Sequence, residues 1–540
     1  MALDLLISDA SVIDGGGVPA WRGSVGVAGG RIVGVWREPG DASARGADAS
    51  RGTSGDVSRG QALPQAERTI DAAGLTLAPG FIDVHTHSDL APFTDPWMDS
   101  ALRQGVTTVV VGNCGMSAWP TAGLGAMVDF LGVDREALPS WTEFDEYLAA
   151  IGAARPACNV AALVGFGSLR TQVMGRERRP ATPTEVGEMR RLLGEAMRAG
   201  ALGMSSGLIY VPDMYATTGE VAAVAAGAAP FGGLYTTHMR AEGHLVFDAV
   251  REAAAIGRQA EVHTHVSHLK LEGRRAWGRA EELLALVDET GATADQYPYA
   301  AWETDLASFL PVWSPVERLE ELLADGDARA RLVRAVEEGE PSWESSVRDS
   351  GWENIVLEAR APDLADRDMA AVAAGRGMRP VDLMFELLLD DPAVAVRGHT
   401  MQEDDVRTIL ARPDVLVGSD GMAVSPEGPL WGTPLHPRSY GTFPRVLGRY
   451  VRECGLLDLE TAIRKMSALP AETFGLRDRG VIAEGAVADL VLFDAATVAD
   501  GAEFGDAHRY PSGIAAVIVG GRLAWDGERR ECAGRAVRRG

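Results

Sequence analysis

Cysteine is scarce in this sequence, and its scarcity limits the fold and the cellular setting to expect. Four of the 540 residues are cysteine, and no two of them form a Cys-x-x-Cys pair. So few cysteines cannot hold a chain of this length together, so no disulfide framework is expected. The low cysteine usage favours a reducing, cytoplasmic setting.

Basic residues and long apolar runs are also in short supply. Lysine and arginine number 51 against 76 acidic residues, which gives a formal net charge of −25. Affinity for nucleic-acid backbones and for anionic lipid depends on lysine and arginine, so this balance argues against both partners. No run of 18 apolar residues occurs, so no transmembrane helix is expected. The first residues, MALDLLISDASVIDG, lack a basic segment and carry acids within their apolar run, which indicates mature protein rather than a signal peptide.

The residues that are present suit a large globular α/β protein, with 46% hydrophobic positions. Short β-type runs dominate 1–76 and 477–540, which predicts one small β-rich domain built from both termini. The Gly/Ser-rich stretch 40–61 is aperiodic and polar, and it predicts a flexible surface insertion. Between the two β-rich ends, 77–476 alternates apolar strand-like runs with helical runs.

Repeated βα units of this kind imply parallel strands with helical crossovers, and about eight of them predict a (β/α)8 TIM-like barrel. The expected strands are 106–112, 161–165, 203–208, 234–238, 262–268, 292–299, 394–400 and 415–420. The stretch 310–378 is rich in Trp, Asp and Arg and breaks the alternation. We expect it to form an insertion over the mouth of the barrel. No pattern indicates an oligomeric state.

Two short motifs at expected strand ends carry metal-binding residue types. His85 and His87 are two residues apart, so a strand would direct both to the same side, and imidazole is a common metal ligand. The alternative is a pair of histidines that only form hydrogen bonds. Cys114 follows the apolar run of 106–112. Its thiolate would be a soft ligand for Zn²⁺, whereas a single cysteine is more often a small buried hydrophobe.

Three further candidates follow later strands. His238 ends one apolar run, and His268 ends another that also contains His263 and His265. Strand parity leaves open which face of that run meets a metal, and the end-of-strand position favours His268. Asp420, in VLVGSDGMA, could ligate a metal and accept a proton from water, or it could merely cap a turn. Taken together, six such residues at successive strand ends predict a metal site.

These motifs resemble the amidohydrolase superfamily, and specifically its D-aminoacylase, or N-acyl-D-amino-acid deacylase, family. The matching stretches include PGFIDVHTHSD, GNCGMS, GMSSGLIYVPDMYATTGE, YTTHMR, SHLK, YPY, GSDG, HPRSYGTFPRVLGRYV and SALPAETFGLRDRGVIAEGAVADLVLFD. They extend over almost the whole chain. The resemblance implies hydrolysis of N-acyl-D-amino acids, small-molecule substrates, to a carboxylate and a D-amino acid.

The resemblance also implies a Zn²⁺ site divided into two positions. The tighter position would use Cys114, His238 and His268, and the second position would use His85, His87 and Asp420. Zinc would activate a water and polarise the amide carbonyl, while Asp420 would serve as general base and then as general acid. The number of metals stays open.

Substrate-binding residues are implied by the same resemblance: Lys270, Tyr297 and Arg438. The alternatives are a surface lysine, a core tyrosine and a structural salt bridge. Three features depart from the family pattern. Glu303 stands where a small hydroxyl residue is expected, Phe166 stands where a histidine is familiar, and the loop 421–435 is longer than usual. A negative charge at position 303 would disfavour acidic substrates.

Other functions agree less well with the residues. Another metal-dependent cleavage, of a cyclic amide or a carbamoyl group, would use the same ligands. A silent scaffold would be expected to have lost part of the ligand set, yet every ligand position is filled. A nucleotide-binding enzyme is not supported, because the sequence has no Gly-x-Gly-x-x-Gly run and no Gly-x₄-Gly-Lys run.

Overall fold

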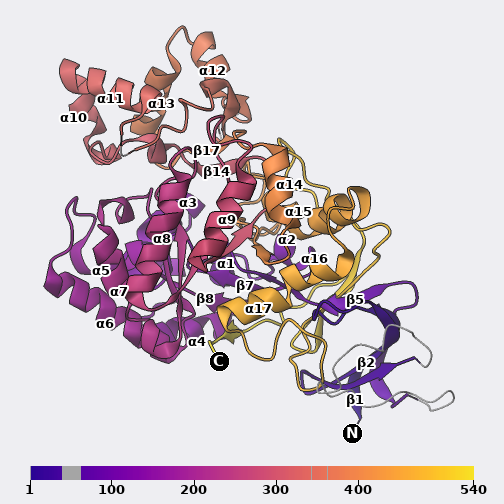
Figure 1. Ribbon diagram of the computed structural model, residues 1–540. Helices are drawn as coiled ribbons and strands as arrows, with labels where there is room; N and C mark the ends of the chain where they lie inside the picture. Colours follow the sequence, from indigo (N-terminus) through magenta and orange to yellow (C-terminus); the bar gives the residue numbers. More distant parts are fainter. Residues whose placement is uncertain (1, 39–62, 342, 360, 362) are drawn as a thin grey trace.

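The computed structural model describes residues 2–38, 63–341, 343–359, 361 and 363–540 (Figure 1). The stretch 40–61, predicted to be a flexible insertion, lies outside these residues. No helix in the described part of the chain is long and apolar enough to cross a membrane.

An eight-stranded sheet combines both ends of the chain. The N-terminal part contributes β1 (Leu3–Val12), β2 (Trp21–Ala28), β3 (Arg31–Arg37), β4 (Ala66–Asp71) and β5 (Thr76–Pro79), and the C-terminal part contributes β19 (Leu490–Phe493), β20 (Ile514–Val519) and β21 (Arg522–Trp525). The two parts meet where β5 pairs antiparallel with β19, with Leu77 opposite Leu492. Both of these leucines are fully buried, so apolar packing stabilises the junction.

Two sheets of parallel strands form the centre of the molecule. One has the order β22 (Ala536–Val537), β8 (Asn159–Ala162), β7 (Val106–Val111) and β6 (Phe81–Asp83). The other has the order β18 (Val415–Val417), β13 (Thr293–Gln296), β12 (His263–Val266), β11 (Leu234–His238), β10 (Gly203–Gly207) and β9 (Val164–Gly165). Only Leu163 separates β8 from β9 in the sequence. A single bridge between Thr86 and Gly421 also joins the chain after β6 to the chain after β18.

Helices connect these parallel strands and surround them in Figure 1. They include α4 (Phe144–Ala154), α5 (Phe166–Met174), α6 (Pro183–Ala199), α7 (Thr218–Ala225), α8 (Val246–Ala260), α9 (Ala280–Thr290), α14 (Glu403–Ala411), α16 (Leu459–Met466) and α17 (Ala468–Phe474). The ends of α6 illustrate local sequence control. Thr182 and Glu185 form a capping box, Pro183 occupies the first turn, and Gly200 ends the helix with a left-handed backbone.

A four-stranded antiparallel sheet lies apart from the parallel strands, at the top of Figure 1. Its order is β14 (Trp302–Asp305), β17 (Ala395–Gly398), β15 (Ile355–Leu357) and β16 (Arg367–Asp368), and α10 (Leu319–Ala324), α11 (Gly326–Glu338), α12 (Met369–Gly375) and α13 (Pro380–Asp390) accompany it. We call residues 302–398 the outer module. The stretch 394–400, predicted as a strand of the barrel, belongs to this antiparallel sheet instead. Its Val396 is buried in the apolar core of the outer module, which explains the different pairing.

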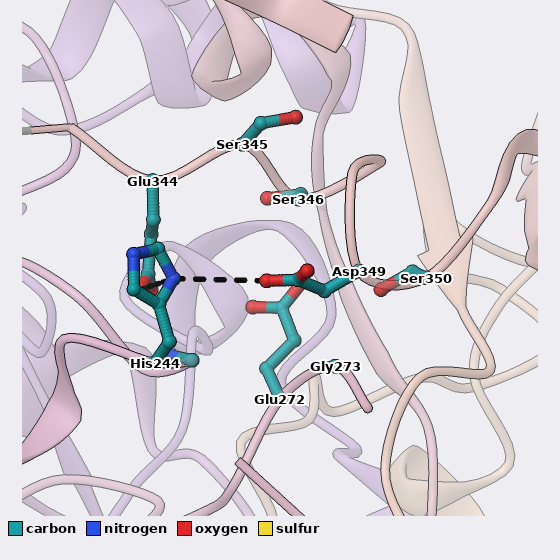
Figure 2. A pocket seen from close by; sticks show the side chains of 9 residues that line it. His244, Glu272, Gly273, Glu344, Ser345, Ser346, Asp349 and Ser350 are labelled. Carbon is teal, nitrogen blue, oxygen red and sulfur yellow. Dashed lines mark hydrogen bonds and ion pairs between the residues drawn. The ribbon is translucent and has the colours of Figure 1, made fainter. Parts of the chain in front are cut away.

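One carboxylate connects the outer module to the loop after β11. Glu344 accepts hydrogen bonds from the backbone N–H groups of Glu242, Gly243 and Leu245, at 2.8, 2.7 and 3.1 Å. His244 lies against the same carboxylate, as Figure 2 shows. Because three backbone donors depend on Glu344, the outer module fixes the position of this loop.

Candidate metal centre

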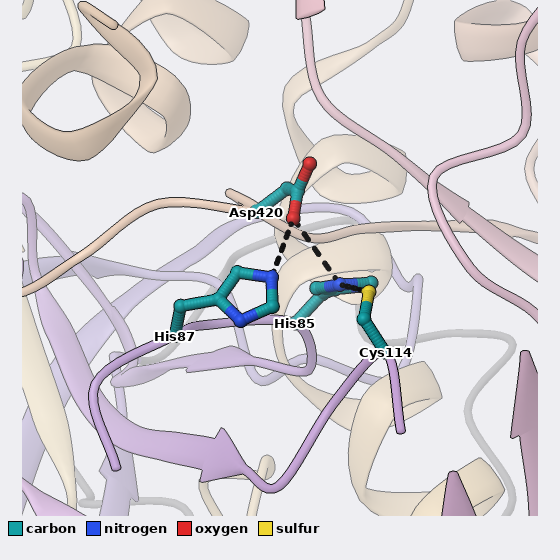
Figure 3. A group of neighbouring side chains, drawn as sticks. All are labelled: His85, His87, Cys114 and Asp420. Carbon is teal, nitrogen blue, oxygen red and sulfur yellow. Dashed lines mark hydrogen bonds and ion pairs between the residues drawn. The ribbon is translucent and has the colours of Figure 1, made fainter. Parts of the chain in front are cut away.

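Six side chains that the sequence analysis selected converge at one end of the parallel strands. His85, His87, Cys114 and Asp420 form one group of candidate ligands (Figure 3). Cys114, His238 and His268 form a second. The candidate ligand atoms within each group lie within 4.8 Å of one another. Cys114 belongs to both groups, so the two groups form one continuous cluster.

The strand ends explain this convergence. His85 and His87 follow β6, Cys114 follows β7, His238 ends β11, and Asp420 follows β18. Backbone bonds hold the first and last of these segments together: the N–H of Asp420 donates to the His85 carbonyl at 2.8 Å, and the N–H of His87 donates to Gly421 at 2.9 Å. Parallel strands bring their carboxyl ends to one edge, where α/β enzymes carry active sites.

His268 reaches the cluster in a way that strand parity could not have shown. Strand β12 ends at Val266, and His268 lies beyond it with a φ of +38°. His265 points elsewhere, with its Nε2 2.9 Å from Asp295 and its Nδ1 2.8 Å from Thr293. His263 contacts Thr293 as well. The preference for His268 over the two earlier histidines therefore agrees with the geometry.

Three of the six candidate ligands have left-handed backbones, namely Cys114 (φ +50°), His268 and Asp420 (φ +52°). Such conformations are uncommon outside glycine and are concentrated at functional sites. At Cys114, the turn also depends on Gly115, where an added Cβ would lie 2.2 Å from Asp213 Oδ2. These strained backbone conformations direct the three side chains towards the cluster.

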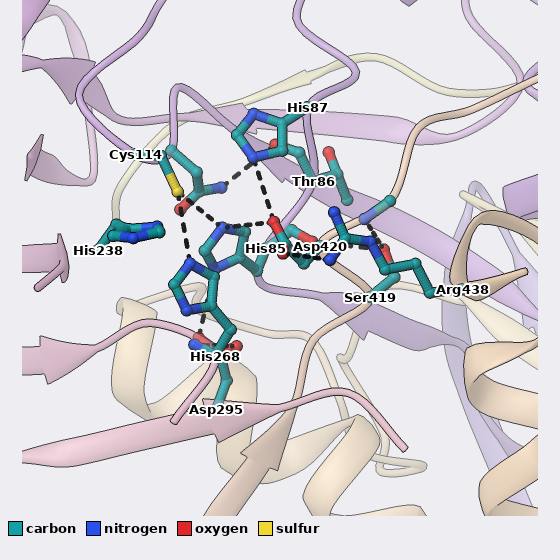
Figure 4. A network of polar contacts seen from close by, with 12 residues as sticks. His85, Thr86, His87, Cys114, His238, His268, Asp295, Ser419, Asp420 and Arg438 are labelled. Carbon is teal, nitrogen blue, oxygen red and sulfur yellow. Dashed lines mark hydrogen bonds and ion pairs between the residues drawn. The ribbon is translucent and has the colours of Figure 1, made fainter. Parts of the chain in front are cut away.

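The interatomic distances are short enough for shared coordination. His85 Nε2 lies 3.2 Å from Cys114 Sγ and 3.2 Å from Asp420 Oδ1. His87 Nε2 lies 3.2 Å from the same Asp420 oxygen, and Cys114 Sγ lies 3.7 Å from His268 Nε2 (Figure 4). Five of the six side chains are buried, and His87 is 24% exposed. His87 therefore marks the side of the cluster that is open to a ligand.

Electrostatics favour the ligating forms of Cys114, Asp420 and His238. Despite burial, the neighbouring anionic groups raise the pKa of the other three candidates, His85, His87 and His268. Although burial opposes ionisation, the charge of His85 and the neighbouring imidazoles of His238 and His268 hold the pKa of the Cys114 thiol well below its usual range. Against the effect of burial, Arg438, His268 and His85 also hold the pKa of Asp420 well below the ordinary value. Burial lowers the pKa of His238, which favours its neutral form. A thiolate, neutral imidazoles and a carboxylate are the donors that Zn²⁺ takes.

Two carboxylates behind the ligands were not selected by the sequence analysis. Asp295, in β13, accepts the N–H of His268 at 3.0 Å and lies 3.6 Å from His85 Nδ1. Glu242, four residues after His238, lies 3.0 Å from His268 Nδ1. Carboxylates in such positions orient metal-ligating imidazoles. The only signal in the sequence was their closeness to other motifs, in ATADQ and YTTHMRAEG.

The three side chains predicted to bind substrate lie beside the cluster and differ in how fully their polar atoms are paired. Lys270 Nζ lies 2.7 and 2.8 Å from the two oxygens of Glu242 and 2.7 Å from His268 Nδ1, so it is already paired. Tyr297 is 1% exposed, and its hydroxyl has no partner within the described part of the chain. Arg438 Nη1 lies 2.6 Å from Asp420 Oδ2, and Arg438 Nε has no partner within that same part.

The three departures from the family pattern have different positions. Glu303 Oε2 lies 3.8 Å from Arg438 Nη2, close to the cluster. The loop 421–435 reaches the cluster as well, because Met422 and Leu430 line a small pocket together with His87. Phe166 begins α5 and is fully buried in the main apolar core.

A serine nucleophile is not formed here, although Gly203–Gly207 has the Gly-x-Ser-x-Gly spacing of a nucleophile elbow. Ser205 Oγ donates to the Gly112 carbonyl and accepts from the Gly115 N–H at 3.1 Å. This hydroxyl supports the turn that carries Cys114. The geometry leaves Cys114 as a ligand among histidines.

Comparison with known proteins identifies the family of the chain. The model of the amidohydrolase family matches residues 68–524. A D-aminoacylase from Alcaligenes xylosoxydans xylosoxydans is 37% identical over 97% of this chain and 94% of its own length, and an N-acyl-D-aspartate deacylase from the same organism is 37% identical over 97% and 93%. The crystal structure of N-acyl-D-glutamate deacylase from Bordetella bronchiseptica, complexed with zinc and a phosphonate inhibitor, is 34% identical, covers 100% of both chains and has a TM-score of 0.80. The chain therefore belongs to the amidohydrolase family, in the group of D-aminoacylase and the N-acyl-D-amino-acid deacylases.

Proposed function

We propose that this protein is a zinc-dependent hydrolase that cleaves the amide bond of N-acyl-D-amino acids and releases a carboxylate and a D-amino acid. One observation carries the proposal: two groups of candidate ligands that share Cys114 lie beside Tyr297 and Arg438, two buried side chains whose donors are in part unpaired among the described residues. Its relatives act on N-acyl-D-amino acids according to their names, which supports the same substrate class here.

The donor set fits zinc. Cys114, His238 and His268 would hold one ion, and His85, His87 and Asp420 would hold a second, weaker one. The Nε2 atom of His238 is buried and has no hydrogen-bond partner among the described residues, which suits a nitrogen that binds a metal. A zinc ion bound here would supply an activated water near neutral pH and a Lewis acid for the amide carbonyl.

Asp420 is the residue best placed to move the proton. Its pKa lies well below the usual range, despite burial, because Arg438 and the neighbouring histidines stabilise the carboxylate. It is therefore ionised at neutral pH and can accept a proton from the attacking water. The same carboxyl can then donate that proton to the departing amine nitrogen.

Tyr297 and Arg438 are the proposed recognition groups for the α-carboxylate of the substrate. A buried hydroxyl and a buried guanidinium nitrogen without partners each cost free energy, which a ligand with two acceptor oxygens would recover. The Arg438 guanidinium also lies over the Tyr297 ring, 5.1 Å from its centroid, so the two groups are held together. Lys270, 5.8 Å from the same ring, adds positive charge to this side of the site.

We further infer that the parallel sheets are two parts of one (β/α)8 barrel. Counting β8 and β9 as one strand, the parallel strands β6, β7, β8–β9, β10, β11, β12, β13 and β18 number eight. The bridge between Thr86 and Gly421 supports closure between the first and the last of them. The mixed eight-stranded sheet built from both ends of the chain supports a separate β-rich domain of 1–76 and 477–540. The outer module contains the proposed insertion 310–378. The unpaired cysteines of the chain support a cytoplasmic location.

The test is chiral chromatography of racemic N-acetylmethionine after incubation with the zinc-loaded protein. Release of D-methionine alone is expected, and treatment with a chelator followed by zinc should abolish and then restore that release. Release of L-methionine at an equal rate would contradict the proposed handedness. Full activity in protein shown by elemental analysis to be metal-free would contradict the zinc requirement.

A further inference from the structure

Glu303 places a carboxylate beside the substrate groups just described. It lies in β14, which begins five residues after Tyr297. Its side chain is 9% exposed, and its Oε2 lies 3.8 Å from Arg438 Nη2. The other side of the same guanidinium contacts Asp420 at 2.6 Å. Glu303 is thus separated from the proposed proton carrier by a single guanidinium group.

The basic side chains around Glu303 are already shared with other carboxylates. Arg438 contacts Asp420, as described above. Arg397, which is opposite Glu303 in the antiparallel pair of β14 and β17, contacts both Glu358 and Asp366. An α-carboxylate of the substrate can still use the unpaired donors of Tyr297 and Arg438. A second carboxylate on the substrate would meet Glu303, while the two guanidinium groups beside it already contact other carboxylates.

A second acid lies on the same side of the strand. Asp305 is two residues after Glu303, and residues at this spacing in a strand project to the same face. Desolvation raises the pKa of Asp305 to about 6, and the charges of His87 and Glu303 act on the same carboxyl. Asp305 itself is exposed to solvent at the end of β14. The two acids add negative charge to β14 beside the site.

We propose that Glu303, assisted by Asp305, selects N-acyl-D-amino acids with a cationic side chain and disfavours those with an acidic side chain. This inference rests on the proposed function and specifies its substrate class. Sequence identity to the relatives does not indicate which side chain the substrate carries, because the D-aminoacylase and the N-acyl-D-aspartate deacylase are both 37% identical to this chain. The proposed preference for a cationic side chain rests instead on the carboxylate of Glu303, which lies beside Arg438.

The effect should be large enough to measure. A pair of unit charges in a partly buried site interacts strongly enough to change specificity by about tenfold or more. Burial raises the pKa of Glu303, whereas the Arg438 guanidinium lowers it, so the assays are run at pH 8 to favour the carboxylate form. High salt screens such interactions only weakly when they are buried.

The experiment compares kcat/KM of the zinc-loaded protein for N-acetyl-D-arginine, N-acetyl-D-methionine and N-acetyl-D-glutamate at pH 8. Arginine should be preferred over glutamate by about tenfold or more. The variant Glu303→Gln should reduce this ratio by about tenfold while its rate for the methionine substrate changes less. Asp305→Asn should act in the same direction with a smaller effect.

Glu386→Gln is the matched control. Glu386 is exposed on α13 of the outer module, so this substitution removes the same charge away from the candidate ligands. It should leave the ratio unchanged. Hydrolysis of all three substrates with the same ratio in wild type and Glu303→Gln would overturn the inference while the proposed function stands. A preference of the wild type for glutamate would overturn it too, even if Glu303→Gln did not fold. Failure to hydrolyse any of the three would instead contradict the proposed function.

Discussion

Removing the hydroxyl of Tyr297 should lower kcat/KM without lowering the free energy of unfolding. The ring is buried, its hydroxyl has no partner among the described residues, and burial holds its pKa well above the usual range, so the proton stays on the oxygen. Tyr235 provides the matched comparison. It is also fully buried, but its hydroxyl lies 2.7 Å from Ser206 Oγ.

The two Tyr→Phe changes should have opposite effects on the free energy of unfolding. A buried polar group without a partner costs about 1–3 kcal/mol, so Tyr297→Phe should leave stability unchanged or raise it. A typical intramolecular hydrogen bond contributes about 0.5–1.5 kcal/mol, so Tyr235→Phe should be destabilised by that amount. A hydrogen bond to a charged group contributes about 1.5–3 kcal/mol, so loss of contact between Tyr297 and the substrate carboxylate should reduce kcat/KM about 10- to 150-fold.

Thermal unfolding and steady-state kinetics on N-acetyl-D-methionine measure both effects. Tyr297→Phe should melt at or above the wild-type temperature with a much lower kcat/KM, and Tyr235→Phe should melt lower with a nearly unchanged kcat/KM. If Tyr297→Phe were destabilised like Tyr235→Phe and kept wild-type kinetics, the hydroxyl would be structural, and the reasoning from its missing partner would be wrong.

Three further changes test other parts of the molecule. Asp420→Asn should keep the ion at Cys114, His238 and His268 but lower kcat about 10²- to 10⁴-fold, as metal analysis and single-turnover kinetics would show; near wild-type turnover would exclude Asp420 as the proton carrier. Glu344→Ala removes the acceptor of three backbone N–H groups in the loop that carries Glu242, so zinc affinity measured by chelator competition should fall about tenfold. Burial lowers the pKa of Lys465 to about 7, so between pH 7 and 10 the unfolded chain binds more protons and this residue makes stability rise with pH. Lys465→Met should flatten that rise in denaturant titrations, and an unaltered slope would contradict the assignment.

The candidate ligands were predictable because each has a local signature. A histidine, cysteine or aspartate directly after an apolar run lies at a strand end, and parallel strands bring such ends together. The carboxylates behind them have no such signature. Asp295 lies inside a strand, and its contacts with His85 and His268 depend on other segments that bring these histidines to it. Partners defined by three-dimensional contact do not follow from local pattern.

The strand at 394–400 shows the same limit for the fold. Its alternation of valines looks like that of a strand in the barrel, and periodicity does not state which sheet a strand joins. Pairing with β14 and β15 follows from the apolar core of the outer module, which is assembled from segments far apart in the sequence. A period of two residues determines which side chains share a face, whereas long-range packing determines the partner.

The outer module also explains how catalysis and specificity can change separately in this chain. Every candidate ligand of the metal lies on the parallel strands or directly after them, whereas Glu303 lies on the first strand of the outer module. Glu303 is connected to the candidate ligands through Arg438, so a substitution at this position can alter the charge beside Arg438 while every candidate ligand is kept. Chains that match this one at every ligand can therefore differ in the side chain that they accept, and position 303 is where such a difference should be sought first.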